Sequence, residues 1–214
     1  MIAINFLDNR PALKINADTL GEAVKKAIAH GNDLTWANLR GVDLHWAYLK
    51  DVDLSGADLF SADLREADLR GAKLCNANLR RANLSKARLC DADLHYAILS
   101  DSYLVGASFN RANLRYADLK YANLRGAHLY DAHLYGVDLD YSCLPLWCGS
   151  LKAKIDKRIF CQLLYHTLRA GQSVDDPEVK KLFAIPEVVA LANRFHRVEE
   201  CGKIKTESEV NQNE

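Results

Sequence analysis

The fold is decided by a stretch that reads ADLFS ADLRE ADLRG AKL at residues 57–74, and the same pattern runs from Asp33 to Leu144. Every fifth residue from Leu34 to Leu144 is Leu, with Phe109 as the one exception among 23 positions. Two residues before each of these positions stands a small residue, which is Ala at 17 of them, and the residue directly before is Asp or Asn at 14. The repeating unit is therefore Ala-(Asp/Asn)-Leu followed by two variable residues.

A period of five fits neither an amphipathic helix nor a flat strand. On a helix five residues advance about 500°, so successive Leu side chains would ring the cylinder instead of forming one stripe. On a strand each step of five residues would reverse the face. Within one unit, however, Ala and Leu are two residues apart and can point the same way. The chain must then turn before the next Ala, which predicts a coil of short sides and corners with Leu and Ala inside.

The residue types at the expected corners agree with this coil. Glycine tolerates turn geometry, and six glycines occupy the corner positions: Gly41, Gly56, Gly71, Gly106, Gly126 and Gly136. The Asp and Asn side chains that precede each Leu can accept hydrogen bonds from the backbone of the turn that follows. The repeats are therefore expected to be structural, and a function must reside in the outward side chains.

These repeats resemble the pentapeptide repeat family over residues 32–144. The resemblance implies an all-β solenoid, a right-handed quadrilateral β-helix with four repeats in each coil. The stretch would then make about 23/4 coils and reach roughly 27 Å at the usual strand spacing of about 4.8 Å. We expect a solenoid with a short N-terminal cap and a C-terminal α-helical segment.

Residues 1–31 are expected to cap the first coil, whose open end would expose Leu side chains and backbone edges. Ile2, Ile4 and Phe6 alternate as in a strand, and Leu13 and Ile15 are candidates to pair with them. Thr19 followed by Glu22 predicts a capping box at a helix start, and Gly31 predicts its end. The helix between them has one apolar face, made of Leu20, Ala23, Val24, Ala27 and Ile28.

Aromatic and basic side chains gather in the late repeats and form the candidate interaction surface. If one coil has 20 residues, Tyr96 lies under Tyr116 and Tyr121 under Tyr141. The expected surface consists of Tyr96, Tyr116, Lys120, Tyr121, Tyr130, Tyr135 and Tyr141. In the alternative interpretation, these aromatic columns only add stacking to a regular wall.

Residues 145–202 have helical character, and residues 203–214 form a polar tail. Apolar residues recur with helical period at 151–169, and Pro177 and Pro186 favour two further helix starts. Their apolar surface exceeds what a plug for one coil requires, which predicts a homodimer. The candidate dimer residues are Ile159, Leu163, Val188, Val189, Leu191 and Phe195. Alternatively, these helices fold back on the last coil of a monomer.

One set of residues has a spacing reminiscent of a zinc site, and it consists of Cys143, Cys148, Cys161 and His166. On a helix Cys161 and His166 would point about 140° apart. Cysteine is also a common buried small residue. We therefore expect core thiols, no metal and no cofactor. No phosphate-binding loop or nucleophile elbow occurs, and a packed coil leaves no substrate pocket, so we do not expect an enzyme.

The net charge of the chain argues against nucleic acid and anionic membranes as partners. The chain has 28 basic and 28 acidic residues, so no global field would attract nucleic acid or an anionic membrane. The start lacks the features of a signal peptide, and no stretch resembles a membrane span, which together predict a cytoplasmic protein with reduced thiols.

The resemblance leaves two functions open. One is a protein-interaction scaffold for an unknown protein partner, and this is the function we expect. The other is DNA mimicry against a type II topoisomerase such as gyrase, which some members of the family practise. Mimicry requires an acidic surface, whereas residues 32–144 carry 15 acidic and 13 basic residues, a net charge of −2.

Overall fold

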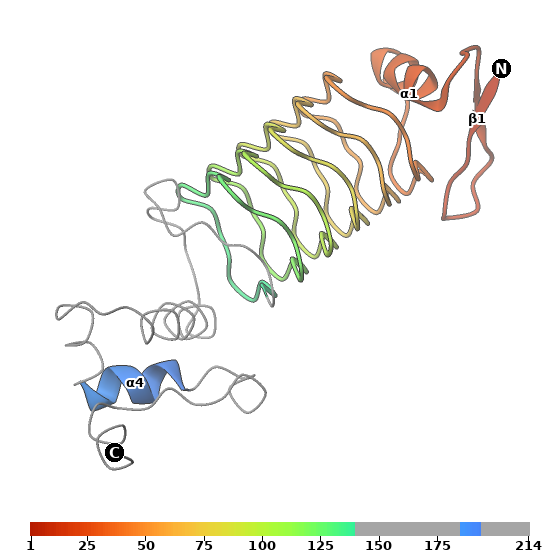
Figure 1. The fold of residues 1–214 in the computed structure, drawn as a ribbon. Helices are drawn as coiled ribbons and strands as arrows, with labels where there is room; N and C mark the ends of the chain where they lie inside the picture. Colours follow the sequence, from red (N-terminus) through yellow and green to blue (C-terminus); the bar gives the residue numbers. More distant parts are fainter. Residues whose placement is uncertain (140–184, 194–214) are drawn as a thin grey trace. The chain divides into compact units, whose positions relative to one another are not determined.

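The computed structural model describes residues 1–139 and 185–193. It divides into two compact units, Met1–Lys154 and Ile155–Glu214. The first contains strand β1 (Ile2–Ile4), strand β2 (Leu13–Ile15), helix α1 (Leu20–Ala29) and then the repeats (Figure 1). Helix α4 (Pro186–Ala192) belongs to the second, and it begins at the predicted proline.

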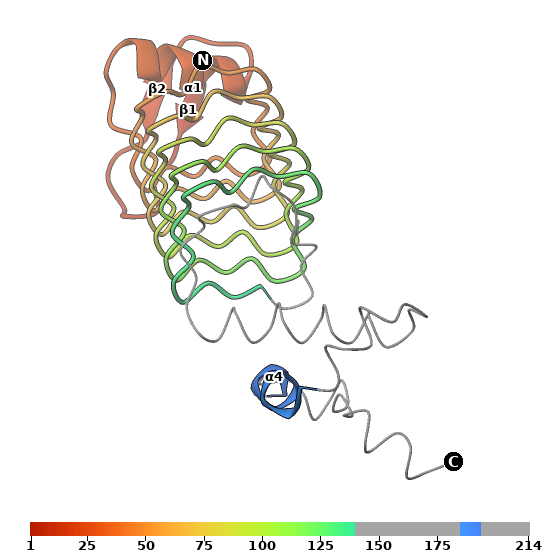
Figure 2. The same cartoon turned by 90° about the vertical axis from the view of Figure 1, so that its left-hand side faces the viewer.

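The N-terminal cap matches its prediction in most details. β1 and β2 pair antiparallel, with Ile2 opposite Ile15. The Thr19 side chain accepts a hydrogen bond from the Glu22 N–H at 3.1 Å and so caps α1. The Glu22 carboxylate accepts the N–H of Asp18 at 2.9 Å, one residue earlier than a capping box requires. The cap lies at the first end of the coil in both views (Figures 1 and 2).

Close backbone contacts join the cap to the coil. Phe6 forms an antiparallel bridge with Ala37. The guanidinium of Arg10 lies 3.8 Å from the centre of the Phe6 ring and donates a hydrogen bond to Asp33 at 2.5 Å. A side chain at Gly21 of α1 would collide with the backbone carbonyl of Asp43, so only glycine permits this approach. The cap and the first coil therefore form one packed structure.

The repeats form a coil with a period of 20 residues. Seventeen parallel bridges each join a residue to the one 20 positions later, from Asn38 with Asp58 to Asp118 with Asp138. In the first of them, Leu39 donates to the Asp58 carbonyl at 2.8 Å, and Asp58 donates to the Ala37 carbonyl at 2.9 Å. Four five-residue repeats therefore make one coil. Figure 2 shows the successive coils stacked along one axis.

At each corner the chain turns within two residues. The turn is closed by a backbone hydrogen bond, such as the one from Val42 to Leu39 at 3.2 Å. The second corner residue has a positive φ at all 21 corners from Trp36 to Gly136, as a type II turn requires. Six of these residues are the predicted glycines, and the other fifteen carry side chains. A left-handed conformation costs a residue with a Cβ roughly 1–2 kcal/mol, so the coil holds these residues in an unfavourable geometry.

The Asp and Asn residues bond to the turns as expected. At thirteen repeats the side-chain oxygen accepts the backbone N–H two residues later, for example from Phe60 to Asp58 at 3.1 Å. This bond replaces water at a corner donor and favours the turn over extended backbone. The preference for Asp and Asn before each Leu therefore has a local structural cause.

The core confirms the predicted inward positions. Every residue at the Leu position from Leu34 to Leu139 is at most 3% exposed, and Phe109 is fully buried in the same column. Burying one such side chain contributes about 1.5–3 kcal/mol. The small residues two positions earlier are also buried, with Val52 as the exception among those at 37–137, all of which the structure describes.

Most predictions for the C-terminal part lie outside the described residues. These include Ile159, Leu163, Phe195, the helix expected at 151–169 and the polar tail. In α4, Val189 is 2% exposed and thus already covered within the single chain, whereas Val188 is partly exposed. The homodimer stays a prediction.

A charge placed in the core tests the inward orientation of the Leu column. Leu84 is fully buried. Burying an unpaired ammonium costs several kcal/mol, which is comparable to a total stability of about 5–15 kcal/mol. We expect Leu84→Lys to prevent folding, as measured by far-ultraviolet circular dichroism and thermal unfolding. Ser85→Lys, on the adjacent corner, is the matched control and should unfold like the parent. Cooperative unfolding of Leu84→Lys near the parent temperature would contradict the inward-Leu arrangement.

Candidate protein-interaction site

One corner of the late coils carries a continuous group of rings, which we call the aromatic corner: His95, Tyr96, Tyr116 and Tyr135. The rings of Tyr96 and Tyr116 are stacked, with centroids 5.1 Å apart and an interplanar angle of 20°. Tyr135 meets Tyr116 edge-on at 5.6 Å. His95 lies 4.2 Å from the Tyr96 ring. The rings therefore extend across three successive coils.

The register of the coil explains this arrangement. Tyr96 and Tyr116 are second corner residues 20 positions apart, so the ladder places one directly after the other, as the expected column predicts. His95 and Tyr135 are first corner residues in the neighbouring column. The next residue in the tyrosine column is Gly136, and a Cβ there would collide with the Tyr116 ring. Glycine at this corner thus leaves room for Tyr116 to lie flat over the next coil.

The aromatic corner is open to solvent. Tyr96 is 50% exposed, Tyr116 43% and Tyr135 54%. Contacts between aromatic rings contribute about 0.5–1.5 kcal/mol each beyond burial of area, so the rings hold one another in place. A partner would meet a preformed group of tyrosine side chains, a residue type enriched at binding hot spots.

The other residues of the predicted surface lie elsewhere. Successive corners are five residues apart along the chain. Tyr121 stands five residues after Tyr116 and so lies at the corner that follows the aromatic corner. Tyr130 stands five residues before Tyr135 and so lies at the corner that precedes it. Lys120 forms an ion pair with Asp138 at 3.0 Å. Tyr141 lies outside the described residues. The structure therefore brings together three of the seven predicted residues, Tyr96, Tyr116 and Tyr135, and adds His95.

A second group of exposed rings, which the predicted surface did not include, lies in the early coils. Trp46 and Tyr48 are each 69% exposed, and His45 lies 4.1 Å from the Trp46 ring. The signal was present, because Tyr48 stands where the repeat usually has Asp or Asn, and Trp46 stands at a second corner position. Both are outward positions, so an aromatic residue there cannot serve the core.

Several carboxylates of the coil lie next to basic residues. Asp68 pairs with Arg70 at 2.5 Å and also lies 3.6 Å from Arg88. The hydrogen bond from Arg70 lowers the pKa of the Asp68 carboxyl, and Arg111 at 2.6 Å does the same for Asp91. These groups stay ionised at neutral pH, but each negative charge has a positive neighbour. No continuous ladder of uncompensated carboxylates forms at these positions.

The described residues include few groups suited to nucleophilic catalysis or metal binding. Burial raises the pKa of the Cys75 thiol to about 11, so at neutral pH it is protonated and a poor nucleophile or metal ligand. In the part of the chain that the structure describes, no three His, Cys, Asp or Glu side chains gather as a metal site would need. The candidate zinc ligands Cys143, Cys148, Cys161 and His166 lie outside that part. Among the described helices, none is long and apolar enough to cross a membrane.

Several solved structures are similar to this chain. A pentapeptide repeat protein from the thylakoid lumen of Arabidopsis thaliana is 31% identical, with a TM-score of 0.40, over 53% of this chain and 77% of that one. HetL, involved in heterocyst differentiation regulation in the cyanobacterium Nostoc, is 32% identical, with a TM-score of 0.19, over 56% of this chain and 71% of that one. QnrB1, a plasmid-mediated fluoroquinolone resistance protein, is 23% identical, with a TM-score of 0.45, over 48% of this chain and 52% of that one.

The family assignment rests on the repeats themselves. Among curated proteins, none matches the chain significantly in sequence. The model of the family described as Pentapeptide repeats matches residues 37–75, 76–111 and 107–144, which is half of the chain. The chain therefore belongs to the pentapeptide repeat family, whose fold implies a right-handed quadrilateral β-helix.

Proposed function

We propose that the protein is a non-enzymatic scaffold that binds a protein partner through the aromatic corner. The observation that carries this proposal is the run of half-exposed, mutually packed rings from Tyr96 through Tyr116 to Tyr135. Exposed tyrosines that form a contiguous group provide large contact area, and such residues dominate the binding energy of many interfaces.

The rigidity of the wall supports the same proposal. Backbone hydrogen bonds fix the corner before any partner arrives, such as those from Tyr96 to Arg115 at 3.0 Å and from Tyr116 to Tyr135 at 2.9 Å. A preorganised surface loses little conformational entropy on binding. Tyrosine has two side-chain torsions, so ordering it adds little to that loss.

Removing the rings tests the scaffold. The triple variant Tyr96→Ser, Tyr116→Ser, Tyr135→Ser should lose at least tenfold in the amount of partner that it retains from a cell lysate, measured by quantitative mass spectrometry. A loss of 1.4 kcal/mol corresponds to about tenfold, and one hot-spot residue contributes about 2 kcal/mol or more. The matched control replaces exposed tyrosines on other walls, Tyr48→Ser with Tyr103→Ser, and should retain the same proteins as the parent. Equal retention by both variants would refute the site.

The competing function is DNA mimicry against gyrase. A DNA duplex presents one negative charge per about 1.7 Å, whereas residues 32–144 have a net charge of −2. Pairs such as Arg40 with Asp58 at 2.9 Å and Lys73 with Asp53 at 3.4 Å interrupt the negative face further. The charges therefore favour the scaffold.

A supercoiling assay separates the two functions. We expect no inhibition of gyrase supercoiling at micromolar protein, because the surface cannot match the charge density of the duplex that gyrase binds. A known DNA-mimicking inhibitor in the same assay is the positive control. Dose-dependent loss of supercoiling would refute the scaffold function and favour DNA mimicry.

We further propose that the chain forms a homodimer through residues 146–200. The support is the apolar helical periodicity of that segment, with a two-fold contact as the commonest closed arrangement. Light scattering should give a dimer for the intact chain and a monomer for a chain that ends at Cys148. A monomeric intact chain, or a dimer that survives truncation, would refute this assembly.

A further inference from the structure

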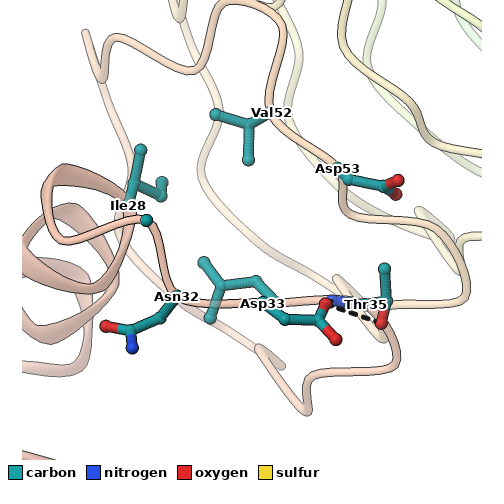
Figure 3. A pocket seen from close by; sticks show the side chains of 8 residues that line it. Ile28, Asn32, Asp33, Thr35, Val52 and Asp53 are labelled. Atoms are coloured by element: carbon teal, nitrogen blue, oxygen red, sulfur yellow. Dashed lines mark hydrogen bonds between the residues drawn. The ribbon is translucent and has the colours of Figure 1, made fainter.

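The ladder of the coil is interrupted at its very first side. Among the described residues, no backbone hydrogen bond joins Asn32–Leu34 to Val52–Leu54, although these segments stand 20 residues apart. The next positions do pair, with Trp36 donating to the Ser55 carbonyl at 2.8 Å and Asp58 to the Ala37 carbonyl at 2.9 Å. The two segments therefore diverge from Thr35 toward helix α1 (Figure 3).

The end of α1 accounts for the divergence. The N–H of Asn32 bonds to the Ala27 carbonyl of α1 at 3.0 Å, and the N–H of Gly31 bonds to the Ile28 carbonyl at 2.9 Å. These bonds hold the start of the first side against the helix. Among the described residues, the segment that follows them, Asn32–Leu34, forms no ladder bond to the second coil.

The gap is a pocket of about 500 Å³, which we call the entry notch. Its lining residues are Ile28, Gly31, Asn32, Asp33, Leu34, Thr35, Val52 and Asp53 (Figure 3). Val52 is partly exposed here, whereas the other inner small residues at 37–137, all described, are buried. The volume lies in the range of about 300–1,000 Å³ that is typical of ligand pockets.

The walls of the entry notch present unpaired main-chain groups. By the pattern of the other coils, the N–H and carbonyl of Asp53 should pair with the Asn32 carbonyl and the Leu34 N–H. Within the described chain, none of these four groups forms a backbone hydrogen bond across the notch. One donor and one acceptor thus line each wall. A single extended peptide could pair with both walls, because alternate residues of a strand direct their amides to opposite sides.

The charged groups of the notch are already satisfied. Asp33 accepts hydrogen bonds from the Thr35 N–H at 2.8 Å and from Arg10 at 2.5 Å. Asp53 accepts the Ser55 N–H at 3.0 Å and lies 3.4 Å from the Lys73 ammonium. The notch therefore offers main-chain hydrogen bonds and the apolar side chains of Ile28 and Val52, not a net charge. This chemistry fits a neutral extended peptide with small apolar side chains.

We propose that the entry notch binds an extended peptide segment of a partner protein as an added β-strand between the first two coils. Strand addition to an open sheet edge is a common mode of peptide recognition, in which main-chain bonds supply affinity and side-chain pockets supply specificity. The site shares no residue with the aromatic corner, so the two proposals stand or fall separately.

Backbone amides in the full-length protein test the proposal by nuclear magnetic resonance. In the free protein, the amides of Leu34 and Asp53 should exchange with solvent faster than those of Leu39 and Asp58, the paired equivalents one side later. The probe is a pool of acetylated, amidated hexapeptides that alternate Thr or Ser with Ala or Val. We expect it to slow exchange at Leu34 and Asp53 and to shift their resonances saturably. The same pool with N-methyl groups on alternate residues should do neither.

A matched pair of variants locates the binding. Val52→Lys places an ammonium in the notch and should raise the Kd for the pool at least tenfold, whereas Val105→Lys, on an exposed corner elsewhere, should leave it unchanged. Circular dichroism establishes that both variants fold. Slow exchange at Leu34 and Asp53 in the free protein would overturn the proposal, and so would the absence of saturable binding at millimolar peptide. Equal binding of the N-methylated pool, or unchanged binding of the pool to Val52→Lys, would also overturn it. Protection that grows with protein concentration alone would also overturn it, in favour of a second copy.

Discussion

The turn at every corner is the constraint on which the structure depends. Leu and Ala can both face inward only if the chain turns within the two residues between repeats, and all 21 described corners do so with a positive φ at the second residue. Fifteen of those residues have a Cβ and tolerate a conformation that is unfavourable by roughly 1–2 kcal/mol. The ladder bonds and the buried Leu column offset that cost, together with the Asp or Asn bond to the turn at thirteen repeats. The corner residues consequently project outward in fixed directions.

A fixed direction and a fixed period together make columns, and the columns explain where rings meet. Tyr96 and Tyr116 stack because the ladder repeats every 20 residues. Trp36 and Gly56 stand at the start of the same column, and a Cβ on Gly56 would collide with the Trp36 ring. In the same way, a Cβ on Gly136 would collide with the Tyr116 ring. Glycine at a corner thus has two roles. It adopts the positive φ without the steric cost of a Cβ, and it leaves room for the ring of the preceding coil.

Much of this could be predicted from the sequence because it is local or periodic. The inward Leu column, the corner glycines, the Asp and Asn bonds, the hairpin and the helix from Leu20 each follow from residue type and spacing. The number of repeats per coil came from the family resemblance, since glycine spacing does not determine it. The entry notch could not be predicted, because it arises from a conflict between the Asn32 bond to α1 and the ladder. The exposure of Trp46 and Tyr48 also follows from their outward positions in the repeat, although the predicted surface did not include them.

The relative strength of charges and rings decides which feature of the wall can select a partner. Exposed ion pairs contribute about 0–1 kcal/mol each, and a partner that competes for Asp68 must first displace Arg70 and Arg88. Exposed rings require no such exchange, because burying them releases only water. Each contributes up to several times the energy of a surface ion pair when a partner covers it. This difference in energy supports the proposal that a partner would bind at the aromatic corner, where exposed rings lie in contact with one another.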